Sequence, residues 1–305
     1  MADNARLNEG VRHMVKGVLA SVLASVMFGV MYVMAPALAP LDGEQIFGWR
    51  VVVTLPFTTA LLWWLQGHVQ LRALAAQVRA RPVLVLLLLA SAALLGVQLW
   101  LFMWAPLHGK ALPVSLGYFL LPLTLVLAGR LLFHERLTRP QLLATALASL
   151  GVGWELWRAG GLELETWIVC LGYPLYFALR RKIGTDHLAG HWLDMVLLVP
   201  VALWFMGRAP SSLWMWQTAP HLQAMLPLLG LISAAGLALY MLASRWLPMG
   251  LFGLLSYVEP VLLALVAVLL GESLVPGQEV MYLAILAAVT VLVVEGVVRL
   301  RQRAP

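Results

Sequence analysis

Ten predominantly apolar stretches follow one another along the chain, separated by short connections. A helix needs roughly 20 apolar residues to cross the roughly 30 Å of hydrocarbon in a bilayer. The stretches lack the alternation of barrel strands, so each is expected to be a transmembrane helix, which satisfies its own backbone hydrogen bonds in lipid. This predicts an all-α polytopic membrane protein, with spans near residues 16–38, 45–66, 82–105, 111–132, 139–157, 162–180, 190–207, 221–243, 249–270 and 277–298.

Composition and charge favour a bilayer over other environments. Hydrophobic residues make up 62% of the chain and charged residues 11%. A soluble domain is about half apolar and about a quarter charged. The net charge is +6, but the basic residues form short clusters between the apolar stretches. This distribution is typical of membrane anchors and argues against a nucleic acid partner.

The basic residues also predict the orientation in the membrane. With the N-terminus in the cytoplasm, the cytoplasmic segments hold sixteen Lys and Arg residues, and the opposite segments hold only Lys110, Arg158 and Arg208. Cytoplasmic loops of membrane proteins carry the excess of basic residues. We therefore expect both termini to be cytoplasmic. Arg50 is the remaining basic residue, and it falls within the second span.

Two segments of the chain, 111–141 and 248–278, resemble each other. Glu135 and Glu272 each begin a Glu-x-Leu sequence, and Gln141 and Gln278 follow at the same distance. The copies cover spans four to five and nine to ten, which predicts two repeats, 1–158 and 159–305. Five helices are an odd number, so the second repeat enters the membrane upside down. Such inverted repeats are typical of secondary transporters.

At these positions the chain resembles the EamA-type transporters of the drug/metabolite transporter superfamily, and most of all their RarD branch, the so-called chloramphenicol-sensitive proteins. The similarity extends over nearly the whole chain. Relatives typically have Asn at the position of Gln98 in the third span. We include Gln98 among the residues expected to contact the substrate. The residues that carry the resemblance are Glu44, Arg50, the run Ser115-Leu116-Gly117-Tyr118-Phe119 with Pro122, the run Arg180-Arg181-Lys182, and Gly271-Glu272.

The resemblance implies a secondary transporter of the bacterial inner membrane. It would move a small metabolite or drug-like solute, in the export direction, by alternating access around a cavity at the membrane midplane. The chain has no Walker-type phosphate loop, so neither ATP nor another cofactor is expected. The alternative is a membrane-embedded transferase that acts on a lipid-linked substrate. A homodimer is left open.

Two prolines fall near the middle of equivalent spans. Pro122 lies in the fourth span and Pro260 in the ninth. Each removes one helical hydrogen bond and leaves the carbonyl of Tyr118 or Ser256 without its donor. Prolines are also simply tolerated in membrane helices. Because the pair recurs in both halves, we expect two hinges beside the substrate site.

Glu259 is the acidic residue expected at mid-bilayer, about eleven residues into the ninth span. A carboxylate at this depth costs roughly 3 kcal/mol on insertion scales, so it must face a cavity, contact a cation or bind a proton. We expect Glu259 to contact substrate and to couple transport to protons. The alternative is a protonated side chain that is hydrogen-bonded to a neighbouring helix.

Other side chains are expected to line the cavity or to lie at its edge. Arg50 either binds an anionic group or extends to the outer interface. Trp100, Tyr118, Tyr176 and Tyr257 are aromatic residues that we expect to hold a flat or cationic solute. His187, His191 and Asp194 share one helical face. We interpret them as an interfacial polar edge of the seventh span and expect no metal there.

Overall fold

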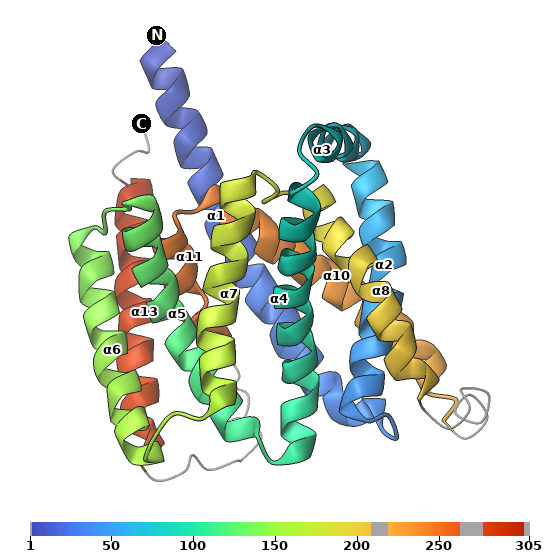
Figure 1. Ribbon diagram of the computed structural model, residues 1–305. Coiled ribbons are helices and arrows are strands. Elements are labelled where there is room, and N and C mark those ends of the chain that lie inside the picture. The colour runs from blue at the N-terminus through green and yellow to red at the C-terminus, as the bar shows by residue number, and fades with distance from the viewer. Residues whose placement is uncertain (1, 209–218, 263–276, 302–305) are drawn as a thin grey trace.

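The computed structural model describes residues 2–208, 219–262 and 277–301, and within these ranges the chain is helical without any strand. Most of the helices run roughly along one direction and form a single bundle (Figure 1). The first helix begins and the last helix ends at the same end of this bundle. We call it the terminal end, and the other the opposite end.

The helices of the N-terminal part are α1 (Ala2–Met34), η1 (Ala35–Leu38), α2 (Gly43–Trp64), α3 (His68–Ala80), α4 (Leu84–Trp104), η2 (Ala105–His108), α5 (Ala111–Phe133) and α6 (Arg139–Ala159). Those of the C-terminal part are α7 (Leu164–Ile183), α8 (Leu188–Gly207), α10 (Leu222–Trp246), α11 (Met249–Leu255) and α13 (Gln278–Arg301).

Seven of the described helices are long and apolar enough to cross a membrane: α1, α2, α4, α5, α8, α10 and α13. Helices α6 and α7 have similar lengths, 21 and 20 residues, but carry charged side chains near their ends. From α2 to α10, apart from α3, every helix begins and ends within two or three residues of a predicted span. The apolar stretches therefore predict the helical segments closely.

Two features differ from the prediction. The sequence predicts no helix between the second and third spans, but α3 lies there as a helix of 13 residues. The ninth span is predicted over residues 249–270 with a hinge at Pro260, whereas α11 already ends at Leu255 and the helix resumes only at residues 258–262. The remainder of that predicted span, from residue 263, lies outside the described residues.

Helices from distant parts of the chain pack against one another in definite pairs. Helix α1 packs on α10 and α4 on α7, while α2 contacts α8 and α10. Helix α5 lies between α7 and α11, and α6 packs along α13. The largest apolar core joins α1, α2, α4, α5, α7, α8, α10 and α11, and a second core joins α5, α6, α11 and α13.

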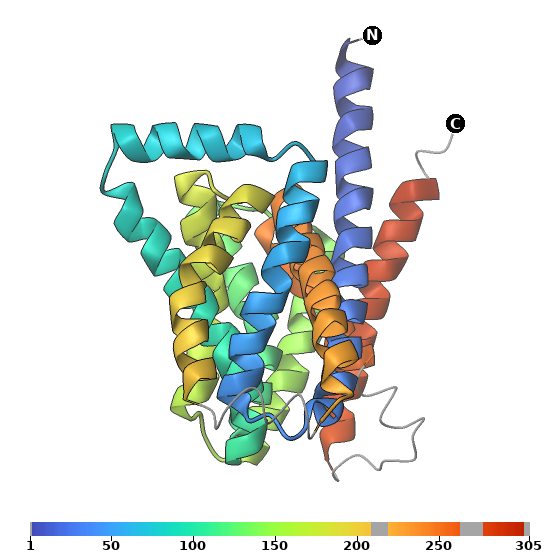
Figure 2. The ribbon, with the colours of Figure 1, turned by 90° about the vertical axis from the view of Figure 1, so that its right-hand side faces the viewer.

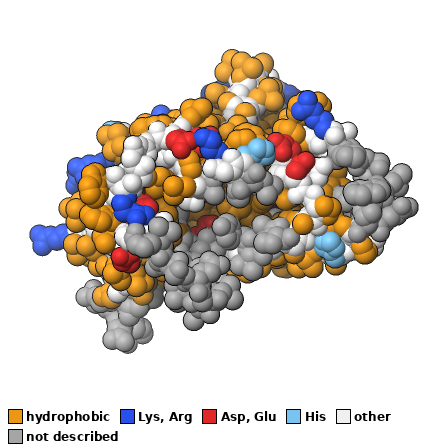
Figure 3. All heavy atoms as spheres, turned by 90° about the horizontal axis from the view of Figure 1, so that it is seen from below, with side chains coloured by type: hydrophobic (Ala, Val, Ile, Leu, Met, Phe, Trp, Pro, Cys, Tyr) orange, Lys and Arg blue, Asp and Glu red, His pale blue; other side chains and the backbone are white. Residues whose placement is uncertain are grey.

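The surface of the opposite end is largely hydrophobic, with charged side chains in small separate groups (Figure 3). Near this end, between η2 and α5, Lys110 Nζ lies 2.6 Å from Glu163 and 3.4 Å from Glu165. Arg158, at the same end, pairs with the buried Glu155, with 3.1 Å between Nε and Oε2.

Gly253 lets α11 approach α5 closely. A Cβ atom at Gly253 would lie 2.6 Å from Leu125 Cβ and 2.9 Å from the carbonyl oxygen of Pro122. We expect Gly253→Ala to lower the melting temperature in detergent by a few degrees, because overpacking costs about 1–3 kcal/mol. Gly153→Ala is the matched control, since nothing lies within 4 Å of its Cβ position. Equal melting temperatures for the two variants would show that this contact does not constrain the bundle.

Candidate functional site

A group of polar side chains from five segments comes together inside the bundle. Glu259, in the helical segment after α11, lies within electrostatic range of the other four members. Tyr118 and Tyr173 are neighbours, with ring centroids 6.3 Å apart. We call this group the central site: Arg50 on α2, Tyr118 on α5, Tyr173 on α7, Tyr240 on α10, and Glu259.

Arg50 is held inside the protein. It is 2% exposed, and its Nε donates a hydrogen bond of 3.0 Å to Ser233 Oγ on α10. Its guanidinium carbon lies 5.8 Å from the ring centroid of Phe102 on α4. Extension to the outer interface, one of the two alternatives for this residue, is therefore excluded. A hydroxyl group and an aromatic face replace part of the water that the cation loses.

Glu259 is half-buried and has no hydrogen bond or ion pair within the described part of the chain. Arg50 is the cation that interacts with it electrostatically, but the two groups are not in direct contact. The central site thus holds a buried cation and a carboxyl group that are close but not bonded.

Aromatic rings surround these two groups. Phe102 contacts Arg50 and also Tyr118, with ring centroids of the latter pair 5.9 Å apart. The hydroxyl groups of Tyr240 and Ser256 lie 3.3 Å apart, and the Tyr240 ring packs 4.6 Å from that of Phe252. The sequence does not single out Tyr173 or Tyr240. Their positions depend on which face of α7 and of α10 turns inward, and apolar membrane helices give little signal for that.

Helix α4 contributes the predicted residues Gln98 and Trp100. Gln98 Nε2 donates a hydrogen bond of 2.8 Å to the carbonyl of Ile168 on α7, so the amide nitrogen of Gln98 links α4 to α7. Gln98 Oε1 and Trp100 Nε1 are buried and have no partner within the described residues. Buried polar atoms normally have a partner, so these two are candidates for contact with water or a solute.

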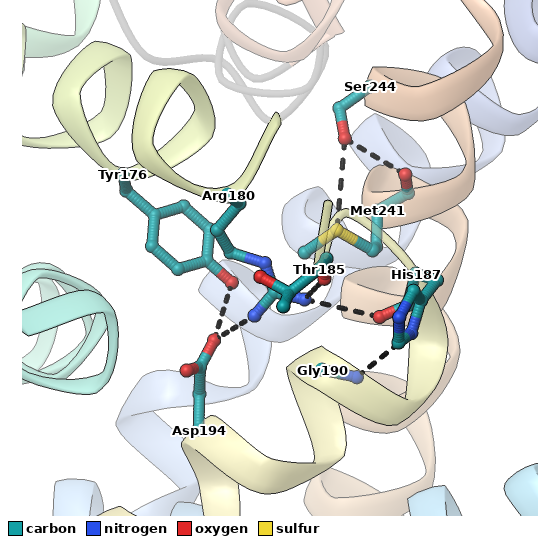
Figure 4. A network of polar contacts seen from close by, with 8 residues as sticks. All are labelled: Tyr176, Arg180, Thr185, His187, Gly190, Asp194, Met241 and Ser244. Atoms are coloured by element: carbon teal, nitrogen blue, oxygen red, sulfur yellow. Dashed lines mark hydrogen bonds and ion pairs between the residues drawn. The ribbon is translucent and has the colours of Figure 1, made fainter. Parts of the chain in front are cut away.

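Tyr176 belongs to a different polar group. Its hydroxyl donates a hydrogen bond of 3.0 Å to Asp194 Oδ2, which also forms an ion pair with Arg180 Nη1 (Figure 4). Arg180 donates in addition to the carbonyls of Thr185 and His187. Arg180 and Asp194 are completely buried. We call Tyr176, Arg180 and Asp194 the α7–α8 ion-pair network.

This network corrects the interpretation of His187, His191 and Asp194 as an interfacial polar edge. Asp194 and His191 are 0% and 1% exposed and face the interior, because Arg180 supplies the positive charge that makes burial of Asp194 tolerable. His187 instead caps α8 by accepting a hydrogen bond of 3.2 Å from the amide of Gly190. Among the described residues, no group of three His, Cys, Asp or Glu is placed to hold a metal.

Tyr257 lies outside the central site. It is fully buried in the second core, and its hydroxyl donates a hydrogen bond of 2.8 Å to the carbonyl of Phe119 on α5. The two prolines also differ from each other. Helix α5 continues through Pro122, while the chain forms a turn at Ser256 and Tyr257, just before Pro260. The carbonyl expected to lose its donor at Pro260 is that of Ser256, at this turn.

Comparisons with known proteins agree with this architecture. Residues 15–154 match the EamA-like transporter family. The Chloramphenicol-sensitive protein RarD of Pseudomonas aeruginosa is 46% identical over 79% of this chain and 81% of its own length. An uncharacterized transporter of Pasteurella multocida is 39% identical over 95% of this chain and 99% of its own length. A solved crystal structure of a protein with 18% identity has a TM-score of 0.63 and covers 94% of this chain and 99% of its own.

The ion pair of Arg180 and Asp194 yields a test of stability. We expect Asp194→Asn to destabilise the protein by about 3–5 kcal/mol, because it leaves a buried guanidinium without its counter-charge. Thermal unfolding in detergent measures this effect. Glu163→Gln, in the exposed pair with Lys110, is the control and should change the melting temperature little.

The double variant Arg180→Gln/Asp194→Asn sharpens this test. Both buried charges are then gone, so its loss of stability should be smaller than the sum of the two single losses. Additive losses would mean that the two side chains act independently.

Proposed function

Because the chain belongs to the EamA-like transporter family and is similar to its RarD members, we propose that this multi-pass membrane protein is a secondary transporter that exports a small metabolite or drug-like solute. It would act in the bacterial inner membrane by alternating access, with the central site as its binding site. The family and the relative from Pasteurella multocida are named as transporters, which gives no support to a transferase acting on a lipid-linked substrate.

The observation that carries this proposal is that the buried Arg50 and the half-buried Glu259 lie within electrostatic range of each other inside the bundle. Charged groups in a membrane interior are costly, and they typically mark a substrate or ion pathway. Here they lie on segments from both predicted halves, among the hydroxyl groups of Tyr118, Tyr173 and Tyr240. A solute held between these groups would contact both halves at once. Relative movement of the halves would then change its access to either side.

The pairing of the helices supports two inverted halves. If the membrane helices are numbered in order, a shift by five relates α1 to α7, α2 to α8, α4 to α10, α5 to α11 and α6 to α13. The α1–α10 contact is then equivalent to the α7–α4 contact, and α2–α10 to α8–α4. The pairs α2–α8, α5–α11 and α6–α13 are each equivalent to themselves. This is the pattern that a pseudo-two-fold axis in the membrane plane produces.

A charged clamp at the terminal end joins both halves. Glu135, just after α5, accepts hydrogen bonds from Arg181 Nη1 at 2.9 Å and from the amides of Met249 at 2.8 Å and Gly250 at 2.9 Å. Arg181 also donates to the carbonyls of Ser244 and Leu247, at 2.8 and 3.1 Å. Glu135 thus lies at the N-terminus of α11, and Arg181 lies at the C-terminus of α10.

Each charge of the clamp complements a helix dipole, since a helix N-terminus attracts anions and a C-terminus attracts cations. The clamp fixes the α10–α11 junction to α5 and α7 at the end that the basic residues assign to the cytoplasm. In the proposed cycle, this clamp closes the cytoplasmic side and must release for that side to open.

Proton coupling is tested at Glu259. Thermal-shift screening of amino acids, organic acids and antibiotics first provides a solute, whose pH-driven uptake is then measured in proteoliposomes. We expect Glu259→Gln to abolish this uptake, because an amide cannot carry the proton, while Glu279→Gln on the exposed first turn of α13 retains it. Wild-type uptake by Glu259→Gln under a pH gradient would exclude coupling through this residue.

The clamp is tested by hydrogen exchange at the amides of Met249 and Gly250. We expect Glu135→Gln to speed their exchange roughly fivefold, since a capping interaction contributes about 1 kcal/mol. Arg136→Gln, at an exposed neighbour, should leave the exchange unchanged.

The charge-reversed double variant Glu135→Arg/Arg181→Glu separates the clamp from an ordinary ion pair. It should fail to restore slow exchange, because each charge then lies at a helix end of its own sign. Full restoration would mean that the helix dipoles contribute nothing.

A further inference from the structure

Helix α3 lies across the terminal end of the bundle, nearly perpendicular to the membrane-spanning helices (Figure 2). It connects α2 to α4 and contacts α8 and α4. Its 13 residues correspond to a length of about 20 Å, too short to cross a bilayer. Its orientation is that of a helix that lies along a membrane surface.

Exposed apolar side chains on both sides of α3 place it at the surface of the hydrocarbon. Trp63 and Trp64, the last residues of α2, are 66% and 81% exposed, and Leu65 follows them. Val83 and Leu86, where the chain enters α4, are 68% and 66% exposed. Exposed tryptophans of this kind belong to the interfacial region of a bilayer. Because the chain leaves and re-enters the apolar layer at these points, α3 lies at the level of the lipid headgroups.

The side chains of α3 divide into distinct faces. Leu71, Leu74 and Val78 share the face that packs on the bundle, where Leu74 is 4% exposed and Leu71 contacts the apolar cluster around Leu62. That contact fixes the rotation of the helix. Arg72 and Arg79 are seven residues apart and therefore share another face, and both are exposed.

The charge of this segment is entirely positive. Arg81 directly follows α3 and is exposed as well, and residues 65–83 contain no Asp or Glu. None of the three arginines forms an ion pair with another part of the chain that the structure describes. Three cations at headgroup level thus lack a protein counter-charge.

We propose that α3 binds the phosphate groups of anionic phospholipids through Arg72, Arg79 and Arg81. A guanidinium group forms paired hydrogen bonds with phosphate oxygens, and a negatively charged leaflet attracts each arginine near it. Because α3 connects α2 and α4, bound lipid would hold the C-terminal end of α2, the helix whose N-terminal part carries Arg50. The proposal rests on the position of α3 in the membrane and does not depend on the transported solute.

The test is retention of phosphatidylglycerol by the full-length protein, measured by native mass spectrometry after extraction from bilayers of phosphatidylcholine and phosphatidylglycerol. Replacement of all three arginines by Gln should reduce phosphatidylglycerol retention about tenfold or more, since each contributes roughly fivefold near an anionic surface. The matched control replaces Arg130, Arg136 and Arg139 by Gln, three exposed arginines at the ends of α5 and α6. It should retain lipid like the wild type.

Two further arms complete the test. Replacement of the three α3 arginines by Lys keeps the charge and should retain much of the lipid, which separates charge loss from misfolding. Inorganic phosphate at millimolar concentration should not displace the lipid, because the site also needs the bilayer surface. The proposal is overturned if the two Gln variants lose lipid equally, if the Lys variant loses as much as the Gln variant, or if phosphate alone competes.

Discussion

The cost of placing charge in hydrocarbon constrains this molecule more than any other interaction. An unpaired ion inside the membrane must find a partner within the protein, because lipid offers none. Arg180 and Asp194 meet this requirement through an ion pair that Tyr176 completes. Arg50 meets it in part, through one hydroxyl group and one aromatic face. Glu259 has no such bonded partner in the described chain, which makes it the exception around which the proposed function is built.

The same constraint separates structural charges from functional ones. In the α7–α8 ion-pair network, one Asp194 oxygen accepts hydrogen bonds from both Tyr176 and Arg180. Two backbone carbonyls accept further hydrogen bonds from Arg180. In the clamp, Glu135 and Arg181 bond to the ends of two helices as well as to each other. The central site instead keeps its cation and its carboxyl group apart. In the proposed function, charges with several bonds hold helices together, whereas the charges with few bonds bind the solute.

The sequence predicts the helices of this fold well because the bilayer thickness sets the length of each apolar stretch. It does not predict α3, since the prediction rests on apolar stretches of membrane-spanning length, and this helix of 13 residues is too short and too polar to be one. It also counts Arg180 and Arg181 among the basic residues of the cytoplasmic segments, although Arg180 is buried and Arg181 bonds to Glu135 after α5 and to the carbonyls of Ser244 and Leu247 at the end of α10. Charge bias identifies the side of the membrane but not the partners of a side chain.

Of the expected site residues, Arg50, Tyr118 and Glu259 come together, because intramembrane charge and a family motif both give a signal in the sequence. Tyr176 and Tyr257 lie elsewhere, and their hydroxyl groups are bonded to Asp194 and to the carbonyl of Phe119. Tyr173 and Tyr240 take their place in the central site. An aromatic residue in an apolar helix gives no sign of the direction it faces, which the packing of several helices decides.

The central claim is that one site becomes reachable from each side of the membrane in turn. The most direct measurement uses a single cysteine in place of Ser256, whose hydroxyl lies 3.3 Å from that of Tyr240, in a chain with Cys170 replaced by Ala. A membrane-impermeant thiol reagent is applied to right-side-out and to inside-out vesicles. The account predicts labelling from both faces. Labelling from one face only, even when Glu135 is also replaced by Gln, would contradict it.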